Sequence, residues 1–164
     1  MQNDKATTQS HRFSYDFTKH QNVEIVMTGM NASKFHFGVL TNEMHMIWVR
    51  YTCGSLESRF RYSKDIVYNN YPWPETPTDK HALAVEVAAQ AVLGARAEFT
   101  DSSLADLYDP NTMPPVLVKA HQQLDKAVDH CYRPQPFTSE AKRIEFLFTL
   151  YEKYNLELLG ARNV

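Results

Sequence analysis

A proline-rich segment near the middle of the chain most constrains its fold. Tyr71-Pro72-Trp73-Pro74-Glu75-Thr76-Pro77 contains three prolines, each of which fixes its own φ and removes a backbone donor. Residues that precede a proline are pushed towards extended backbone. The segment therefore predicts a stiff extended linker. Because the hydrophobic pattern differs on its two sides, we place a domain boundary here, with one domain at 1–74 and the other at 75–164.

Before this linker, apolar residues mostly recur with the period of two that is typical of strands. We expect strands at 13–18, 23–28 and 34–37, and an extended segment at 56–67. One helix interrupts them, with Thr41 as its N-cap and Gly54 just past its end. We expect four aromatic residues of this half to be substantially buried: Trp48, Tyr51, Phe60 and Tyr62.

After the linker the pattern becomes helical. Thr78 or Asp79 begins a helix that runs to about 99, and Leu83, Val87, Ala91 and Ala95 are its predicted inward face. A short helical turn follows Ser102 or Ser103, and Thr138 or Ser139 caps the last helix. Pro114-Pro115 opens another helix, whose predicted stripe is Leu117, Ala120, Leu124, Val128 and Cys131. The expected fold class is α+β: a small mixed strand/helix subdomain followed by a mostly α-helical C-terminal bundle.

Composition and sequence ends exclude several classes of protein. Apolar residues make up 43% of the chain and charged residues 22%, as in globular domains. No apolar run approaches the roughly 18–20 residues that span a bilayer, so no membrane partner is expected. The polar start at 1–5 predicts no secretory signal. Two cysteines, Cys53 and Cys131, fit a reducing compartment, and we expect a cytoplasmic location.

The motifs of common enzymes are missing from the chain. It has no G-x-G-x-x-G, no P-loop, no G-x-S-x-G and no H-E-x-x-H. The seven histidines are scattered, and none pairs with cysteines at zinc spacing. Asn69-Asn70-Tyr71-Pro72-Trp73 has its asparagines and prolines in the wrong order for the Asn-Pro-Pro-aromatic motif of adenine methyltransferases. We therefore expect no catalytic residue, metal ligand or cofactor-binding residue in this segment.

The net charge of −2 conceals an uneven distribution. Residues 1–64 carry eight Lys or Arg against five Asp or Glu, whereas 65–164 carry nine against fourteen. Four of the cations lie within 44–64, together with one acid. A local basic stretch of this kind can bind phosphates even when the whole chain is slightly acidic.

The basic stretch around 57–64 has the chemistry of a base-reading strand. In an extended strand Glu57, Arg59 and Arg61 share one side. An arginine fork fits guanine O6 and N7, and a carboxylate accepts from cytosine N4, so these three residues are candidates for base readout. Arg50, Ser63 and Lys64 are candidates for phosphate contacts. Side-chain chemistry alone favours the alternative, an exposed strand with a surface charge pair that adds little stability.

Several longer motifs resemble a known family, the MmeI-like restriction–modification enzymes. The motifs are Phe35-His36-Phe37-Gly38-Val39-Leu40-Thr41, Met44-His45-Met46, Cys53-Gly54-Ser55-Leu56-Glu57-Ser58-Arg59, Tyr62-Ser63-Lys64-Asp65-Ile66-Val67-Tyr68-Asn69-Asn70, Pro72-Trp73-Pro74, Ala89-Gln90-Ala91-Val92-Leu93, Ser103-Leu104-Ala105-Asp106-Leu107-Tyr108-Asp109-Pro110, Met113-Pro114-Pro115, Lys119-Ala120-His121 and Leu124-Asp125. Members of this family join a nuclease, an adenine-N6 methyltransferase, a target-recognition domain and a helical tail. The resemblance runs from about 20 to 155.

The resemblance implies that the chain corresponds to the carboxy-terminal end of such an enzyme. Residues 1–74 would be the distal part of the target-recognition domain and 75–164 the helical domain. In the family, the positions that flank the serine of the Leu-x-Ser-x run read one base pair, and the residue two further on reads another. These positions are Glu57, Arg59 and Arg61 here, and the resemblance therefore favours base readout over a surface charge pair.

Three classes of function remain to be compared. The leading hypothesis is a non-catalytic DNA-recognition and scaffold segment of a restriction–modification methyltransferase. Its partners would be double-stranded DNA and the methyltransferase domain of the parent chain, where S-adenosylmethionine would bind. The alternative is a protein–protein docking module without direct DNA contact, and the missing motifs disfavour a stand-alone enzyme. We expect this segment alone to bind DNA weakly and to self-associate through apolar surface.

Overall fold

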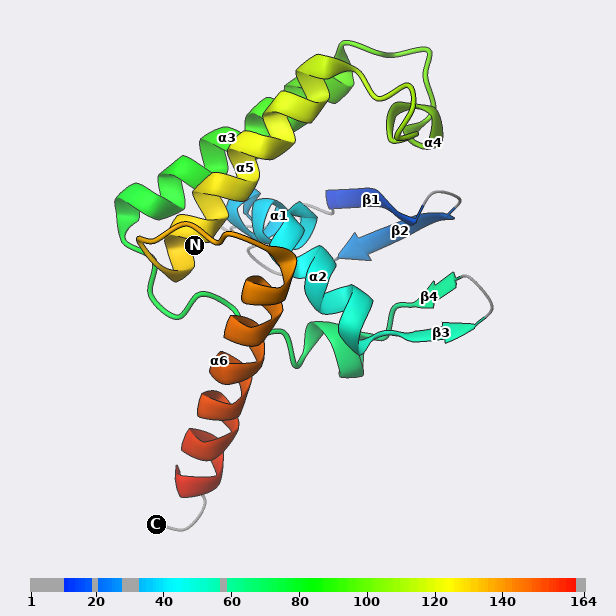
Figure 1. Cartoon of the computed structure of the whole chain (residues 1–164). Helices are drawn as coiled ribbons and strands as arrows, with labels where there is room; N and C mark the ends of the chain where they lie inside the picture. Colours follow the sequence, from blue (N-terminus) through cyan, green and yellow to red (C-terminus); the bar gives the residue numbers. More distant parts are fainter. Residues whose placement is uncertain (1–10, 19–20, 28–32, 57–58, 162–164) are drawn as a thin grey trace, which may run out of the picture.

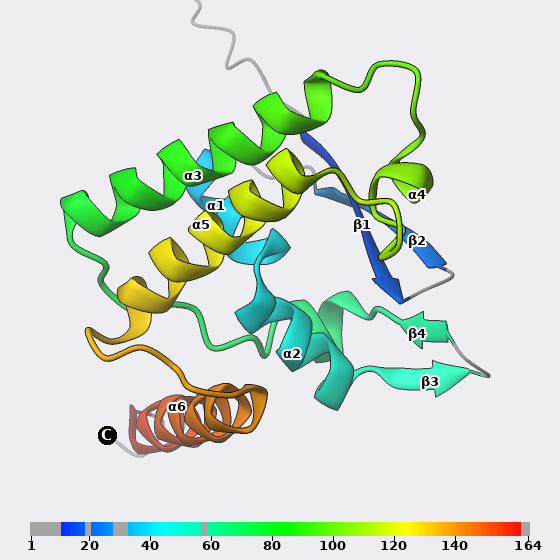
Figure 2. The ribbon, with the colours of Figure 1, turned by 45° about the horizontal axis from the view of Figure 1, so that its top comes forward.

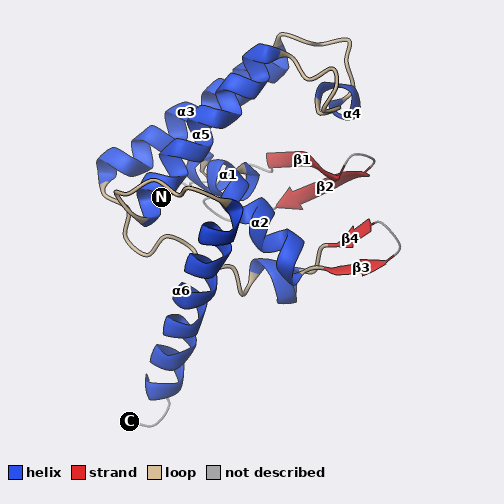
Figure 3. Cartoon of the chain, viewed as in Figure 1, coloured by secondary structure: helices blue, strands red, loops and turns tan. Residues whose placement is uncertain are grey.

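Helices dominate the fold of the chain in the computed structural model, which describes residues 11–18, 21–27, 33–56 and 59–161. Figure 3 shows strands only in two separate two-stranded hairpins. The buried residues of the described core come from helices and from the loops between them. The expectation of an α+β class is therefore wrong, because a lone two-stranded hairpin offers no sheet face on which a core could form.

Two consecutive helices, α1 (Lys34–Thr41) and α2 (Glu43–Thr52), meet at Asn42. The Asn42 side chain donates to the carbonyl of Val39 and accepts from the backbone N–H groups of Met44 and His45. One amide thus closes the first helix and opens the second. The predicted strand at 34–37 is wrong, since Ser33 and His36 form a capping box that starts α1 instead. The N-cap of α2 is Asn42 rather than Thr41.

Helices α3 (Asp79–Ala97) and α5 (Pro115–Tyr132) lie side by side over α1 in Figures 1 and 2. A Cβ added to Gly38 of α1 would lie 2.6 Å from Val85 of α3 and 3.1 Å from Leu124 of α5. The absence of a side chain at Gly38 is therefore what permits this close approach. The first core cluster contains Phe37, Val85, Ala88, Ala89, Val92, Ala95, Leu107, Tyr108, Leu117, Ala120, Leu124 and Val128.

The predicted inward face of α3 is largely wrong. Leu83 and Val87 are 61% and 63% exposed, while Val85, Ala89 and Val92 are fully buried. The helix is rich in alanine and valine on every side, so its sequence does not mark one face. Its N-cap is Thr78, one of the two residues expected. The short helix α4 (Leu104–Leu107) is capped by Ser103 and connects α3 to α5.

The last helix, α6 (Glu140–Ala161), packs mainly against α2 and contacts the end of α5. Leu147 and Ile144 of α6 are buried beside Trp48 of α2, whose ring centroid lies 5.4 Å from that of Phe148. The second core cluster contains Val39, Met44, Met46, Ile47, Trp48, Val49, Val67, Tyr71, Phe137, Ile144 and Leu147. Both clusters therefore combine residues from before and after the proline-rich segment.

Two hairpins project from the same side of this helical body (Figures 1 and 2). The first joins β1 (His11–Thr18) to β2 (Gln21–Met27), and the second joins β3 (Gly54–Leu56) to β4 (Arg59–Arg61). A short π-helix, η1 (Lys64–Tyr68), follows β4. The expectation that 56–67 is extended throughout is wrong at its end, where Ser63 starts this helical turn. None of the helices in the described residues has the length and apolar character to cross a membrane.

Candidate nucleic-acid interface

The β3–β4 hairpin carries the two arginines that the sequence predicts to be base readers. Its antiparallel register pairs Leu56 with Arg59 and Gly54 with Arg61. Arg59 and Arg61 therefore stand two positions apart in one short strand that leaves the helical body. Glu57, the third candidate base reader, lies outside the described residues.

Buried polar contacts hold the base of this hairpin. Tyr62, the residue after β4, has its hydroxyl 3.3 Å from Nε2 of His45. Nδ1 of His45 lies 2.9 Å from the carbonyl of Leu40, so that nitrogen carries the proton and Nε2 accepts from the phenol. Burial lowers the pKa of His45 to about 4, which keeps the imidazole neutral. The hairpin is thus joined to α2 by a neutral hydrogen-bonded pair.

The expectation of four buried aromatic residues holds only in part. Trp48 is 1% exposed, and its indole N–H donates to the carbonyl of Val67 at 3.0 Å. Tyr62 is half-buried, whereas Tyr51, in the last turn of α2, is 57% exposed. The side chain of Phe60 lies outside the described residues. The prediction is therefore confirmed for Trp48, holds in part for Tyr62 and is wrong for Tyr51.

Two of the predicted phosphate-contacting residues mark the start of η1. Ser63 Oγ accepts from the backbone N–H of Ile66 at 3.3 Å. The backbone carbonyl of Ser63 accepts from the backbone N–H of Val67 at 2.8 Å. The hydroxyl proton of Ser63 is not used in the bond to Ile66. Lys64 is the first residue of η1, and its side chain lies outside the described residues.

Arg50, the third predicted phosphate contact, is occupied by carboxylates. Its Nη2 lies 2.6 Å from Oε1 of Glu43, and its Nε lies 3.5 Å from Oε1 of Glu140. The arginine side chain is 34% exposed. It therefore links α2 to the first turn of α6.

Sequence reasoning missed a second group of charges, which lies on α5 and α6 close to the start of α2. Asp125 Oδ1 accepts from the backbone N–H of Glu43 at 2.9 Å. Asp129 holds Arg143 through two bonds, of 2.6 Å and 3.3 Å. Burial raises the pKa of Asp125 to about 6. Asp125 and Asp129 are four residues apart on one helix, so the sequence could have shown that they share a face. It could not have shown which residues they contact.

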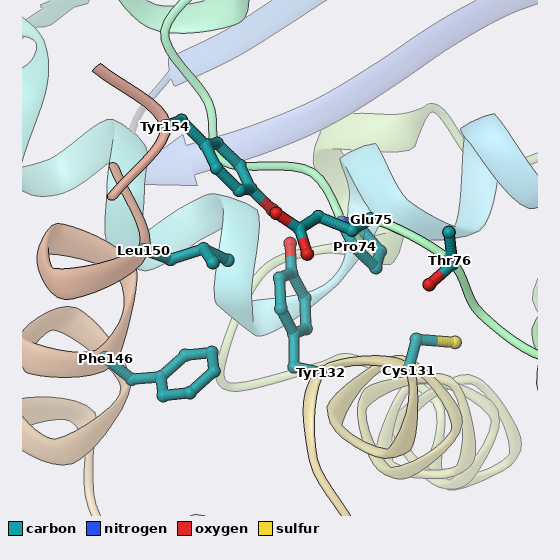
Figure 4. Close-up of a pocket in the computed structure, with 8 residues that line it drawn as sticks. All are labelled: Pro74, Glu75, Thr76, Cys131, Tyr132, Phe146, Leu150 and Tyr154. Carbon is teal, nitrogen blue, oxygen red and sulfur yellow. The ribbon is translucent and has the colours of Figure 1, made fainter. Parts of the chain in front are cut away.

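A cavity of about 240 Å³ lies between the proline-rich segment and the last two long helices (Figure 4). The Tyr132 hydroxyl lies 2.7 Å from the Tyr71 hydroxyl and donates to the carbonyl of Pro72, while the Tyr154 hydroxyl donates to the carbonyl of Trp73. These hydrogen bonds attach the proline-rich segment to α5 and α6. We therefore interpret the cavity as a gap between packed elements rather than as a binding site. Its lining residues are Pro74, Glu75, Thr76, Cys131, Tyr132, Phe146, Leu150 and Tyr154.

Comparison with known proteins gives consistent matches over most of the chain. The family model for the MmeI target recognition domain matches residues 3–75, and that for the MmeI C-terminal domain matches residues 77–159. DNA methyltransferase A of Bacillus subtilis (strain 168) is 38% identical over 123 residues, which are 75% of this chain and 14% of that protein. A solved structure of the Type IIL restriction–modification enzyme MmeI in complex with DNA is 40% identical, with a TM-score of 0.74. That match covers 89% of this chain and 20% of the MmeI chain, so the chain spans a small part of either relative.

Proposed function

Because the chain belongs to the MmeI-like family of restriction–modification enzymes, we propose that it recognises specific duplex DNA for a methyltransferase domain of a longer enzyme. The observation that carries this proposal is the β3–β4 hairpin. It lies within the target-recognition match, contains two arginines and projects from a helical body that holds its base. A two-stranded ribbon of this kind fits the major groove of B-DNA.

Base readout would be shared by three side chains of the hairpin. Arg59 and Arg61 each have the planar fork that matches O6 and N7 of guanine. Glu57 would accept from N4 of a cytosine, so that Glu57 and Arg59 together read one C·G pair. Arg61 would read a neighbouring purine.

Phosphate contacts would come from the residues after β4. Ser63 retains a hydroxyl proton that it can donate to a phosphate oxygen, and Lys64 adds a positive charge. Arg50 already contacts Glu43 and Glu140, so a phosphate would compete with two carboxylates for it. We therefore propose that Arg50 stabilises the helix beneath the hairpin instead of contacting DNA.

The chemistry would take place in another part of the enzyme. Adenine-N6 methylation requires S-adenosylmethionine, and we propose that a separate methyltransferase domain binds it. The helical residues from Asp79 onward would connect that domain to the recognition hairpin. A role on bacterial DNA would place the enzyme in the cytoplasm.

The sharpest test reverses the charges of the proposed base-reading pair in an intact MmeI-like enzyme that carries this chain. Glu57→Lys combined with Arg59→Asp preserves the net charge of the pair but exchanges donor and acceptor. The preferred base pair at one position should change from C·G to G·C, because each mismatched contact costs on the order of 1–3 kcal/mol. Mapping of methylated sites measures this change. Either single substitution should be worse than the double one, and an unchanged site at full efficiency would refute base readout by these residues.

A second candidate function, docking onto another protein surface, is favoured by an apolar groove on α3. The exposed Leu83 and Val87 line this groove of about 460 Å³, together with Ala91 and with Ala127 of α5. Salt distinguishes the two functions. DNA binding should weaken steeply between 50 and 200 mM salt. Lys64→Ala, which removes a proposed phosphate contact, should reduce that salt dependence, whereas the exposed Lys126→Ala should leave it unchanged. Absence of duplex binding at low salt would favour docking.

A further inference from the structure

Six charged side chains converge where α2, α5 and α6 meet. Four are carboxylates and two are guanidiniums, and each of the three helices supplies two of them. They are Glu43 and Arg50 of α2, Asp125 and Asp129 of α5, and Glu140 and Arg143 of α6. We call this group the charged junction. It joins elements from the two family matches, since α2 lies within 3–75 and the other two helices lie within or mostly within 77–159.

The firmest contact inside the junction fixes α5 to α6. Arg143 and Asp129 form a two-bond fork, and their side chains are only 17% and 11% exposed. Such a planar, two-point contact sets orientation as well as distance. Burial alone would lower the pKa of Arg143, but the hydrogen-bonded Asp129 carboxylate raises it, and the charges of Asp125 and Glu43 raise it further.

Asp125 connects this fixed pair to the start of α2. Its carboxylate accepts from the backbone N–H of Glu43, which is the first residue of that helix. The first N–H groups of a helix have no partner within the helix, and they form its positive end. A partly buried carboxylate from α5 therefore satisfies one of these groups and sets the position of the α2 N-terminus. Arg50 supplies a second point of attachment, by lying between Glu43 and Glu140.

The position of α2 determines the direction in which the β3–β4 hairpin projects. Only Cys53 separates the end of α2 from the start of β3, and the Cys53 N–H still bonds to the carbonyl of Val49 in the helix. The hairpin returns to the same helix through the contact of Tyr62 with His45. A rotation of α2 is thus transmitted to both strands.

We propose that Asp125 and Arg143 are positioning residues, which orient the β3–β4 hairpin by anchoring the N-terminus of α2 to α5 and α6. This inference rests on the proposed function, because it assigns the orientation of the DNA-reading element to side chains of the C-terminal domain. Neither residue touches the hairpin or the DNA in this role. Both act through α2.

Amide hydrogen exchange of α2 and of the β3–β4 ladder tests this inference without DNA. Asp125→Ala removes the acceptor, whereas Asp125→Asn removes the same charge and keeps an oxygen that can accept from Glu43. We expect Asp125→Ala to speed exchange across the hairpin by about tenfold, which corresponds to one typical hydrogen bond, and Asp125→Asn to restore slow exchange. Val92→Ala, which destabilises the first core cluster, serves as the control for a general loss of stability and should leave hairpin exchange close to wild type.

Equal exchange in Asp125→Ala and wild type, or equal acceleration by Val92→Ala, would overturn the inference. Arg143→Lys provides the same measurement should Asp125→Ala not fold, because it keeps the charge but loses the fork to Asp129. Duplex DNA affinity is measured on the same proteins. Loss of DNA binding by Asp125→Ala but not by Asp125→Asn supports the inference further. Failure of the wild-type chain to bind duplex DNA would refute the proposed function. The exchange rates would still decide whether the charged junction positions the β3–β4 hairpin.

Discussion

The two core clusters of this chain differ in how they are held together. The first, between α1, α3 and α5, is packed mostly with small aliphatic side chains such as Ala89 and Val92, although it also holds Tyr108, which is hydrogen-bonded to His121 and Arg96. The second, beneath the β3–β4 hairpin, is built around Trp48 and also buries His45 and Asn42, all hydrogen-bonded. Apolar packing is tolerant of exchange, whereas buried polar bonds specify one arrangement. The polar cluster lies under the element that would have to meet DNA in a defined orientation.

The largest expected effect comes from opening a cavity in the first cluster. Leu124→Ala should lower the free energy of unfolding by about 2–5 kcal/mol, because Leu124 is fully buried between α5 and α1. Urea unfolding at pH 7 measures this loss. Leu83→Ala, on the exposed face of α3, should stay within about 0.5 kcal/mol of wild type. Equal losses in the two variants would mean that the buried face of α3 and α5 has been misassigned.

Acid should destabilise both clusters through buried histidines. Burial lowers the pKa of His45 and of His121 from 6.5 to about 4. The stability that follows from keeping these imidazoles neutral is complete above pH 6.5 and is lost as the pH falls towards 4. The loss should reach on the order of 2–3 kcal/mol for each residue. Urea unfolding between pH 7 and 4 measures it, and His130→Gln, at an exposed position, should leave the profile unchanged.

Asp125 should oppose this acid effect. Burial raises its pKa from 3.8 to about 6, so its ionisation costs stability as the pH rises from 4 to 6, and protonation returns that stability as the pH falls. Asp125→Asn should therefore make the fall in stability between pH 6 and 4 steeper than in wild type. A shallower fall in this variant would contradict the assignment of Asp125 as a buried carboxyl group.

A smaller effect tests the close approach of α1. Gly38→Ala should cost about 1–3 kcal/mol, because the new methyl group meets Val85 at 2.6 Å and Leu124 at 3.1 Å. Gly94→Ala on α3 is the matched control, since nothing lies within 4 Å of its added Cβ. That variant should gain up to about 1 kcal/mol from helix propensity. Similar unfolding midpoints for the two variants would show that α1 can move away from α3 and α5 without cost.

Local sequence determined most of the helical half. Thr78 and Ser103 are N-caps as expected, Pro114-Pro115 opens α5, and Leu117, Ala120, Leu124 and Val128 form its buried stripe. Caps, prolines and an amphipathic stripe act within a few residues, so they can be recognised without knowing the fold. The motifs shared with the MmeI-like enzymes are likewise short continuous runs of sequence, so the family could be identified without the structure.

The strand predicted at 34–37 was wrong for a local reason, because the short alternating pattern was followed and the helix caps Ser33 and Asn42 were overlooked. Tertiary structure alone decided other features. The buried face of α3 was set by where α1 and α5 pack, since alanine and valine recur around α3 and do not mark one face. The charged junction joins Glu43 to residues about eighty positions away, and no local pattern encodes such a contact. Side chains distant in sequence can be matched only when the helices that carry them have been placed.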